Sequence, residues 1–64
     1  MKTIDKTNGK KPNENQEYNL TVEFHTGVRY VYYGANRKEA LKKFQNRFGG
    51  FSGFISKEWS IEDK

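Results

Sequence analysis

Residues 36–50 carry signals for both ends of one amphipathic helix, and this segment constrains the fold more than any other. Asn36 is a favoured N-cap residue, and Glu39, three positions later, completes a capping box. Gly49 and Gly50 end the segment because glycine accepts the left-handed conformation that follows a helix. We therefore predict a helix over residues 37–48. Its apolar stripe consists of Ala40, Leu41, Phe44 and Phe48.

Two segments before this helix and one after it have strand patterns. Residues 18–25 alternate apolar and polar, which is typical of a half-buried strand. Residues 28–33 are rich in Val and Tyr, and the intervening Gly27 indicates a hairpin turn. Residues 54–61 form the third predicted strand. We expect its face toward the helix to carry Ile55, Lys57, Trp59 and Ile61.

The length of the hairpin loop decides which side chains enter the core. A two-residue loop, Thr26-Gly27, pairs Val22 with Val31 and is the register we prefer. It places Tyr30 and Tyr32 on the sheet face away from the core, which then contains Leu20, Val22, Phe24, Val31 and Tyr33. A loop one residue longer would bury Tyr30 and Tyr32 instead.

The order strand, strand, helix, strand predicts a small two-layer α+β domain of the ββαβ type. The third strand lies antiparallel beside the first, so a three-stranded antiparallel or mixed sheet has the order 3-1-2, with the helix on one face. The 64 residues allow one domain, over residues 18–64. Residues 1–17 are too polar to offset their ordering entropy, and we expect a disordered tail there.

Composition argues against several functional classes. The chain has no cysteine and one histidine, His25, so we expect no metal site, no thiol chemistry and no cofactor. About 47 ordered residues leave little room for a water-excluding pocket, so we expect neither catalysis nor a small-molecule substrate. No apolar run approaches the roughly 20 residues that span a bilayer. With a polar N-terminus, this predicts a cytoplasmic protein without membrane contact.

The net charge of +4 equals the net charge of the helical segment alone. Only Glu39 opposes the basic residues there, which are Arg37, Lys38, Lys42, Lys43 and Arg47. Such a face is typical of polyanion binding, to a phosphate backbone or to an acidic protein surface. The alternative is a solvated face that keeps the domain soluble. Tyr30 and Tyr32 would add a base-stacking platform if exposed, or would simply reflect strand propensity.

Residues 38–41, Lys-Glu-Ala-Leu, begin the helix, and Gly53-Phe54 leads into a strand that carries Lys57. With these motifs, residues 22–59 resemble the bacteriophage T7-type inhibitors of bacterial RNA polymerase. The resemblance implies a phage-encoded protein, acting in the host cytoplasm, that inhibits a host enzyme by wedging between its parts. That family has an acidic helix, whereas this helix is basic.

Three functional hypotheses follow for a non-enzymatic, macromolecule-binding domain. In the first, Lys38, Lys42, Lys43 and Arg47 contact nucleic-acid phosphates, with Tyr30 and Tyr32 stacking on bases. In the second, the edge of the second or third predicted strand docks on a host protein, with Lys57 near this surface. In the third, the protein is a structural component of a larger assembly. The sequence predicts no oligomeric state.

Overall fold

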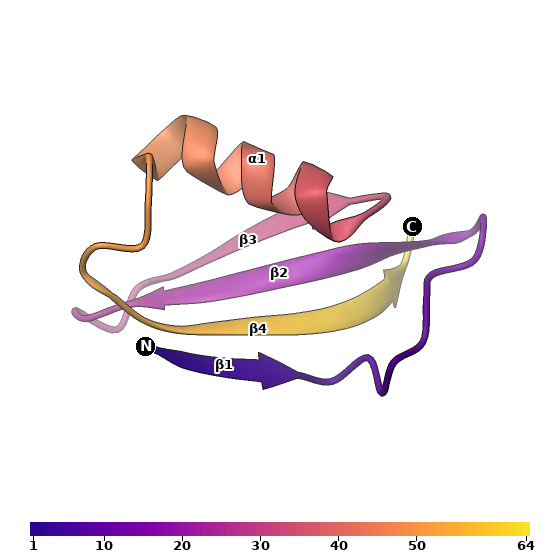
Figure 1. Ribbon diagram of the computed structural model, residues 1–64, viewed down its shortest axis with the longest axis horizontal. Helices are drawn as coiled ribbons and strands as arrows, with labels where there is room; N and C mark the ends of the chain where they lie inside the picture. Colours follow the sequence, from indigo (N-terminus) through magenta and orange to yellow (C-terminus); the bar gives the residue numbers. More distant parts are fainter.

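In the computed structural model, which describes all 64 residues, one helix packs on one face of a four-stranded sheet (Figure 1). The elements are β1 (Lys2–Asp5), β2 (Gln16–Phe24), β3 (Arg29–Gly34), α1 (Arg37–Phe48) and β4 (Phe54–Asp63). The sheet order is β1-β4-β2-β3, in which β2 is antiparallel to both neighbours and β1 is parallel to β4. The order predicted for three strands is thus retained within a larger α+β sheet.

The predicted number of strands is wrong, because the segment expected to be a disordered tail contains β1. This short strand uses the outer edge of β4, where Thr3 pairs with Lys57 and Asp5 with Trp59. Pairing at a sheet edge depends on backbone groups, so a polar sequence can supply it. Directly after β1, the Lys6 backbone N–H donates to the carbonyl oxygen of Trp59 at 2.8 Å. Composition alone gave no sign of these contacts.

The helix begins and ends where its capping residues predict. The Asn36 side chain accepts from the Glu39 backbone N–H at 2.9 Å, and the Glu39 carboxylate accepts from the Ala35 N–H at 3.0 Å. Gly49 has φ 74° and donates to the Gln45 carbonyl at 2.7 Å. Ala40 and Phe44 are fully buried. Phe48, at the end of the same stripe, stays 37% exposed and packs its ring edge-on to Tyr30.

The hairpin adopts the register that we did not prefer. Val22 pairs with Tyr30 and Leu20 with Tyr32, because residues 25–27 form a three-residue loop. Gly27, with φ 92°, donates to the Phe24 carbonyl at 2.9 Å, a turn that adds one residue in the left-handed conformation. Tyr30 and Tyr32 therefore face the helix, as the longer loop would require. Val31 and Tyr33 lie on the opposite face, 46% and 39% exposed.

The core lies between α1 and the sheet and is mostly aromatic. Its buried members are Tyr18, Leu20, Val22, Ala40, Phe44, Phe54 and Trp59. A register shift in β4 leaves Ile55 as an extra residue, since Phe24 pairs with Phe54 and Glu23 with Ser56. Ile55 is consequently exposed, and its predicted place toward the helix belongs to Phe54. Trp59 and Ile61 face the helix side as predicted, because they pair with Leu20 and Tyr18.

Candidate functional site

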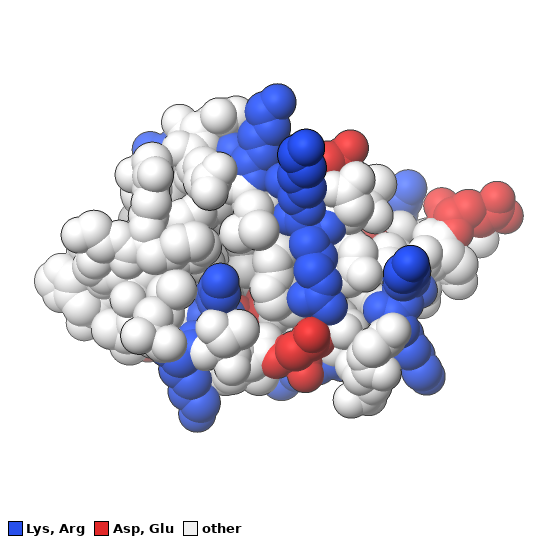
Figure 2. All heavy atoms as spheres, in the orientation of Figure 1, with Lys and Arg blue, Asp and Glu red and all other residues white.

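The side of α1 that faces solvent carries two lysines one turn apart, Lys38 and Lys42. Both are exposed, and neither forms an ion pair. Together with Leu41 and Gln45 they line a shallow hollow along the helix. In Figure 2, a column of basic atoms crosses the upper middle of the face in view, with acidic atoms at its lower end and toward the right. The ammonium groups of Lys38 and Lys42 are therefore available to an external anion.

Lys43 and Arg47 lie on the flank of α1 nearest β3. The Lys43 ammonium donates to the carbonyl oxygen of Tyr33 at 2.7 Å, so one of its three N–H groups is used. The Arg47 guanidinium lies 5.3 Å from the ring centroid of Tyr30 and 5.4 Å from that of Phe48. Glu39 caps the helix instead of pairing with Lys43. Both cations thus lack an acidic partner and are partly held in place.

Arg37 differs from the other basic residues of the helix because it is engaged within the molecule. Its Nη2 lies 3.1 Å from Asp5 Oδ2 and 3.2 Å from Thr7 Oγ1. Its guanidinium also lies 5.0 Å from the Trp59 ring and 5.1 Å from the Tyr18 ring. Arg37 therefore ties the end of β1 to the core.

Asp5 receives most of its stabilisation locally. The Thr7 hydroxyl donates to Asp5 Oδ1 at 2.6 Å and the Thr7 backbone N–H donates to the same oxygen at 2.9 Å. These two bonds, with a smaller contribution from Arg37, hold the pKa of the Asp5 carboxyl below its ordinary value. The sequence did not indicate Asp5 and Thr7 as site residues, because their common partner, Arg37, lies 32 and 30 residues further along the chain.

The structure places the remaining predicted site residues on the helix side of the sheet. Lys57 is half-buried and its ammonium lies 4.9 Å from the Phe51 ring centroid. Tyr30 packs edge-on against Phe48, and Tyr32 packs edge-on against Phe44. The expected stacking platform on the open sheet face is therefore absent.

The Tyr32 hydroxyl is buried and has no hydrogen-bond partner. This burial raises the pKa of Tyr32, and the nearby Arg47 charge only partly opposes it. The hydroxyl thus destabilises the packed interface, since a buried polar group without a partner loses its hydration. It points into packed side chains and offers nothing to a ligand from outside.

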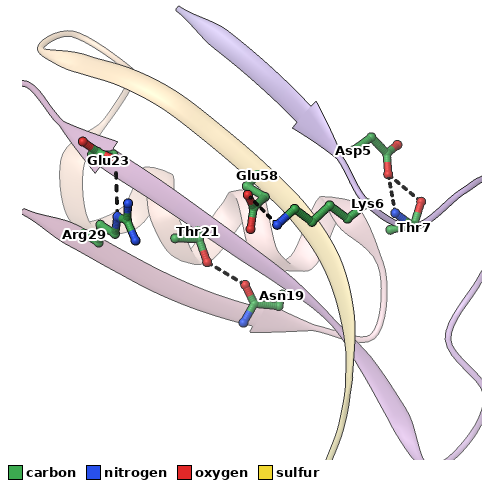
Figure 3. Close-up of polar contacts among 8 residues, drawn as sticks. All are labelled: Asp5, Lys6, Thr7, Asn19, Thr21, Glu23, Arg29 and Glu58. Carbon is green, nitrogen blue, oxygen red and sulfur yellow. Dashed lines mark hydrogen bonds and ion pairs between the residues drawn. The ribbon is translucent and has the colours of Figure 1, made fainter.

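Two ion pairs lie on the open sheet face (Figure 3). Arg29 lies 3.3 Å from Glu23, and Lys6 lies 3.4 Å from Glu58. The Thr21 hydroxyl donates to Asn19 Oδ1 at 2.8 Å between these two pairs. The open sheet face therefore pairs two of its basic side chains, whereas four basic side chains of α1 have no acidic partner.

No metal site and no membrane-spanning helix is found. No group of three or more His, Cys, Asp or Glu side chains is arranged to hold a metal ion. The one helix is too short and too polar to cross a bilayer. No protein-family model, no curated protein and no solved structure matches this chain.

Proposed function

We propose that this protein binds nucleic acid through the phosphate backbone, with α1 as the contact element. The observation that carries the proposal is the group of four cations on one helix that have no acidic partner: Lys38, Lys42, Lys43 and Arg47. Arg37 is left out of this group because Asp5 and Thr7 occupy it. Lys57 is also left out, because it is half-buried with its ammonium beside Phe51.

Two features favour a phosphate backbone over a solubilising role. Arg47 is exposed but stacked against Tyr30, and a guanidinium held over an aromatic ring loses less freedom when it binds a phosphate. On the opposite sheet face, Arg29 and Lys6 pair with carboxylates, whereas four cations of α1 have no acidic partner. A purely solubilising surface requires neither arrangement.

The fold suggests sequence-independent contact. Phosphate contacts position a protein on a duplex, whereas base edges specify the sequence. With Tyr30 and Tyr32 packed under the helix, no aromatic residue of the predicted site remains for stacking. Four phosphate contacts contribute about −3.6 to the slope of log affinity against log salt concentration.

Fluorescence anisotropy with a labelled 20-base-pair DNA duplex tests the proposal. The variant Lys38→Gln/Lys42→Gln removes two contacts and should lower affinity by about 60-fold at 0.1 M salt, the counterion-release value. The control Lys2→Gln/Arg29→Gln removes the same charge from the other sheet face and should change affinity little. Equal losses in both variants, or binding that is independent of salt, would overturn the proposal.

A second candidate function is inhibition of a host protein through the free edge of β3. Alternate residues of an antiparallel edge strand point their backbone groups outward. Here these are Arg29, Val31 and Tyr33, and the Tyr33 carbonyl already accepts from Lys43. The exposed Val31 side chain adds an apolar contact to this edge. The third predicted strand, β4, pairs with β1 along Ser56–Trp59 and has no free edge there.

A pulldown from nuclease-treated bacterial lysate separates the two candidates. Edge docking predicts one stoichiometric protein partner that is lost in Val31→Lys, since lysine on an edge strand opposes strand addition. Nucleic-acid binding predicts that nuclease removes the captured material and that Val31→Lys leaves duplex affinity unchanged. Retention of one protein partner by Val31→Lys would exclude the edge as its docking surface.

A further inference from the structure

The turn after β1 forms a second basic surface, separate from the helix. Three lysines, Lys6, Lys10 and Lys11, line a hollow of about 300 Å³ there. Further hydrogen-bonding groups around it come from Asn8, Gln16 and Ser60. No carboxylate lines the hollow. Cations with hydroxyl and amide groups, and no carboxylate, make an environment suited to a phosphate group.

The backbone of this turn is well defined by its own bonds. Asn8 and Gly9 have φ angles of 55° and 75°, the pair of left-handed residues that a type I′ turn requires. Lys10 donates its backbone N–H to the Thr7 carbonyl at 3.0 Å, which closes the turn. Thr7 itself is buried and bonded to Asp5 through both its N–H and its hydroxyl. The lysines therefore project from an anchored loop.

The charges of this surface are only partly compensated. Lys6 pairs with Glu58 at 3.4 Å, on the side of the open sheet face. Lys10 and Lys11 form no ion pair. Asp63, the acidic group bonded to the hollow's Gln16 side chain, is exposed at the end of β4. Two unpaired ammonium groups thus remain for an external anion.

The hollow adjoins the basic helix. Thr7 is one of the residues that line the hollow, and its Oγ1 lies 3.2 Å from Nη2 of Arg37, the first residue of α1. The longest dimension of the domain is 34 Å, which corresponds to about ten base pairs at 3.4 Å each. We propose that the Lys10–Lys11 hollow is a second phosphate-binding site, which extends the α1 interface along the same nucleic acid. This inference rests on the proposed function.

The salt dependence of binding to the 20-base-pair duplex tests the second site. Two contacts at Lys10 and Lys11, added to four on the helix, predict a log–log slope of about −5.4. Affinity would then fall about 1,800-fold between 50 and 200 mM salt, against about 150-fold for four contacts alone. The variant Lys10→Gln/Lys11→Gln should bring the slope to about −3.6. The variant Lys2→Gln/Arg29→Gln should leave it unchanged.

The same measurements distinguish a failure of the helix interface from a failure of the second site. If Lys10→Gln/Lys11→Gln keeps the wild-type slope while Lys38→Gln/Lys42→Gln reduces it, the second site is wrong and the helix interface stands. If the turn variant reduces the slope and the helix variant does not, the proposed function of α1 is wrong and an anion site exists at the turn alone. Reductions by both variants support both proposals.

Discussion

The sharpest structural prediction concerns the point where the helix N-terminus meets the end of β3. A Cβ atom added at Gly34 would lie 2.6 Å from the Ala40 backbone nitrogen and 2.9 Å from the Asn36 carbonyl oxygen. Both neighbours belong to the first turn of α1 and its cap, which cannot move without breaking capping bonds. The replacement Gly34→Ala should therefore separate the helix from the sheet or strain both.

The expected cost follows from overpacking. Forcing extra volume into a packed contact costs about 1–3 kcal/mol of folding free energy, and backbone neighbours place Gly34→Ala in the upper part of that range. For a domain of this size each kcal/mol shifts Tm by about 4–8 °C. Gly34→Ala should thus lower Tm by about 8–24 °C.

Gly50→Ala is the matched control. Gly50 has no atom within 4 Å of an added Cβ and no left-handed backbone. Alanine there should stabilise the fold by about 0.4–1 kcal/mol, because it restricts the unfolded chain. Thermal unfolding followed by circular dichroism gives both values. Equal Tm values for the two variants would refute the close approach of helix and strand at Gly34.

Three further predictions follow from particular contacts. Tyr32→Phe should raise the free energy of unfolding by about 1 kcal/mol in urea titrations, because it removes a buried hydroxyl that has no hydrogen-bond partner. A lower free energy of unfolding would show that the hydroxyl does form a hydrogen bond. The same variant should weaken the loss of stability above pH 10, since a raised folded-state pKa gives stability that is lost as pH rises through it. Asp5→Asn should speed hydrogen exchange at the Lys6 amide, and unchanged exchange would show that Asp5 does not hold β1. In the wild type, β1 should loosen as pH falls below about 3.8, because the folded-state pKa of Asp5 lies below that value.

Local sequence signals predicted the helix to the residue because its caps act within a few positions. Asn36, Glu39 and Gly49 each bond to a residue at most four positions away. The order of the three main strands followed from the same local patterns and from the reversal of direction by the helix. These features depend on short-range chemistry that composition and spacing reveal.

The hairpin register and β1 could not be predicted because they depend on contacts distant in sequence. Either loop length gives an alternating apolar face, and the three-residue loop is favoured once Tyr30 and Tyr32 can pack against Phe48 and Phe44. The strand β1 forms because β4 offers a free edge and Arg37 accepts Asp5 as a partner. Neither opportunity is visible in residues 1–17 alone.

The availability of the predicted site residues also depends on contacts that are distant in sequence. The sequence treated the five basic residues of the helix as equivalent, but folding commits Arg37 to β1 and leaves Lys38 and Lys42 free. It also brings Lys10 and Lys11 from the expected tail to the surface beside the helix start. The sequence shows which residues are charged, whereas tertiary contacts decide which of these charges remain free to bind an external anion.

We propose above that the unpaired cations on α1 bind nucleic-acid phosphates. Amide chemical shifts of ¹⁵N-labelled protein, recorded during titration with the 20-base-pair duplex at low salt, test it most directly. If α1 binds phosphates, the largest shifts will occur in residues 38–47, with further shifts in residues 6–11 from the second site. Shifts confined to β3 and the open sheet face, or no shifts at saturating duplex, would contradict it.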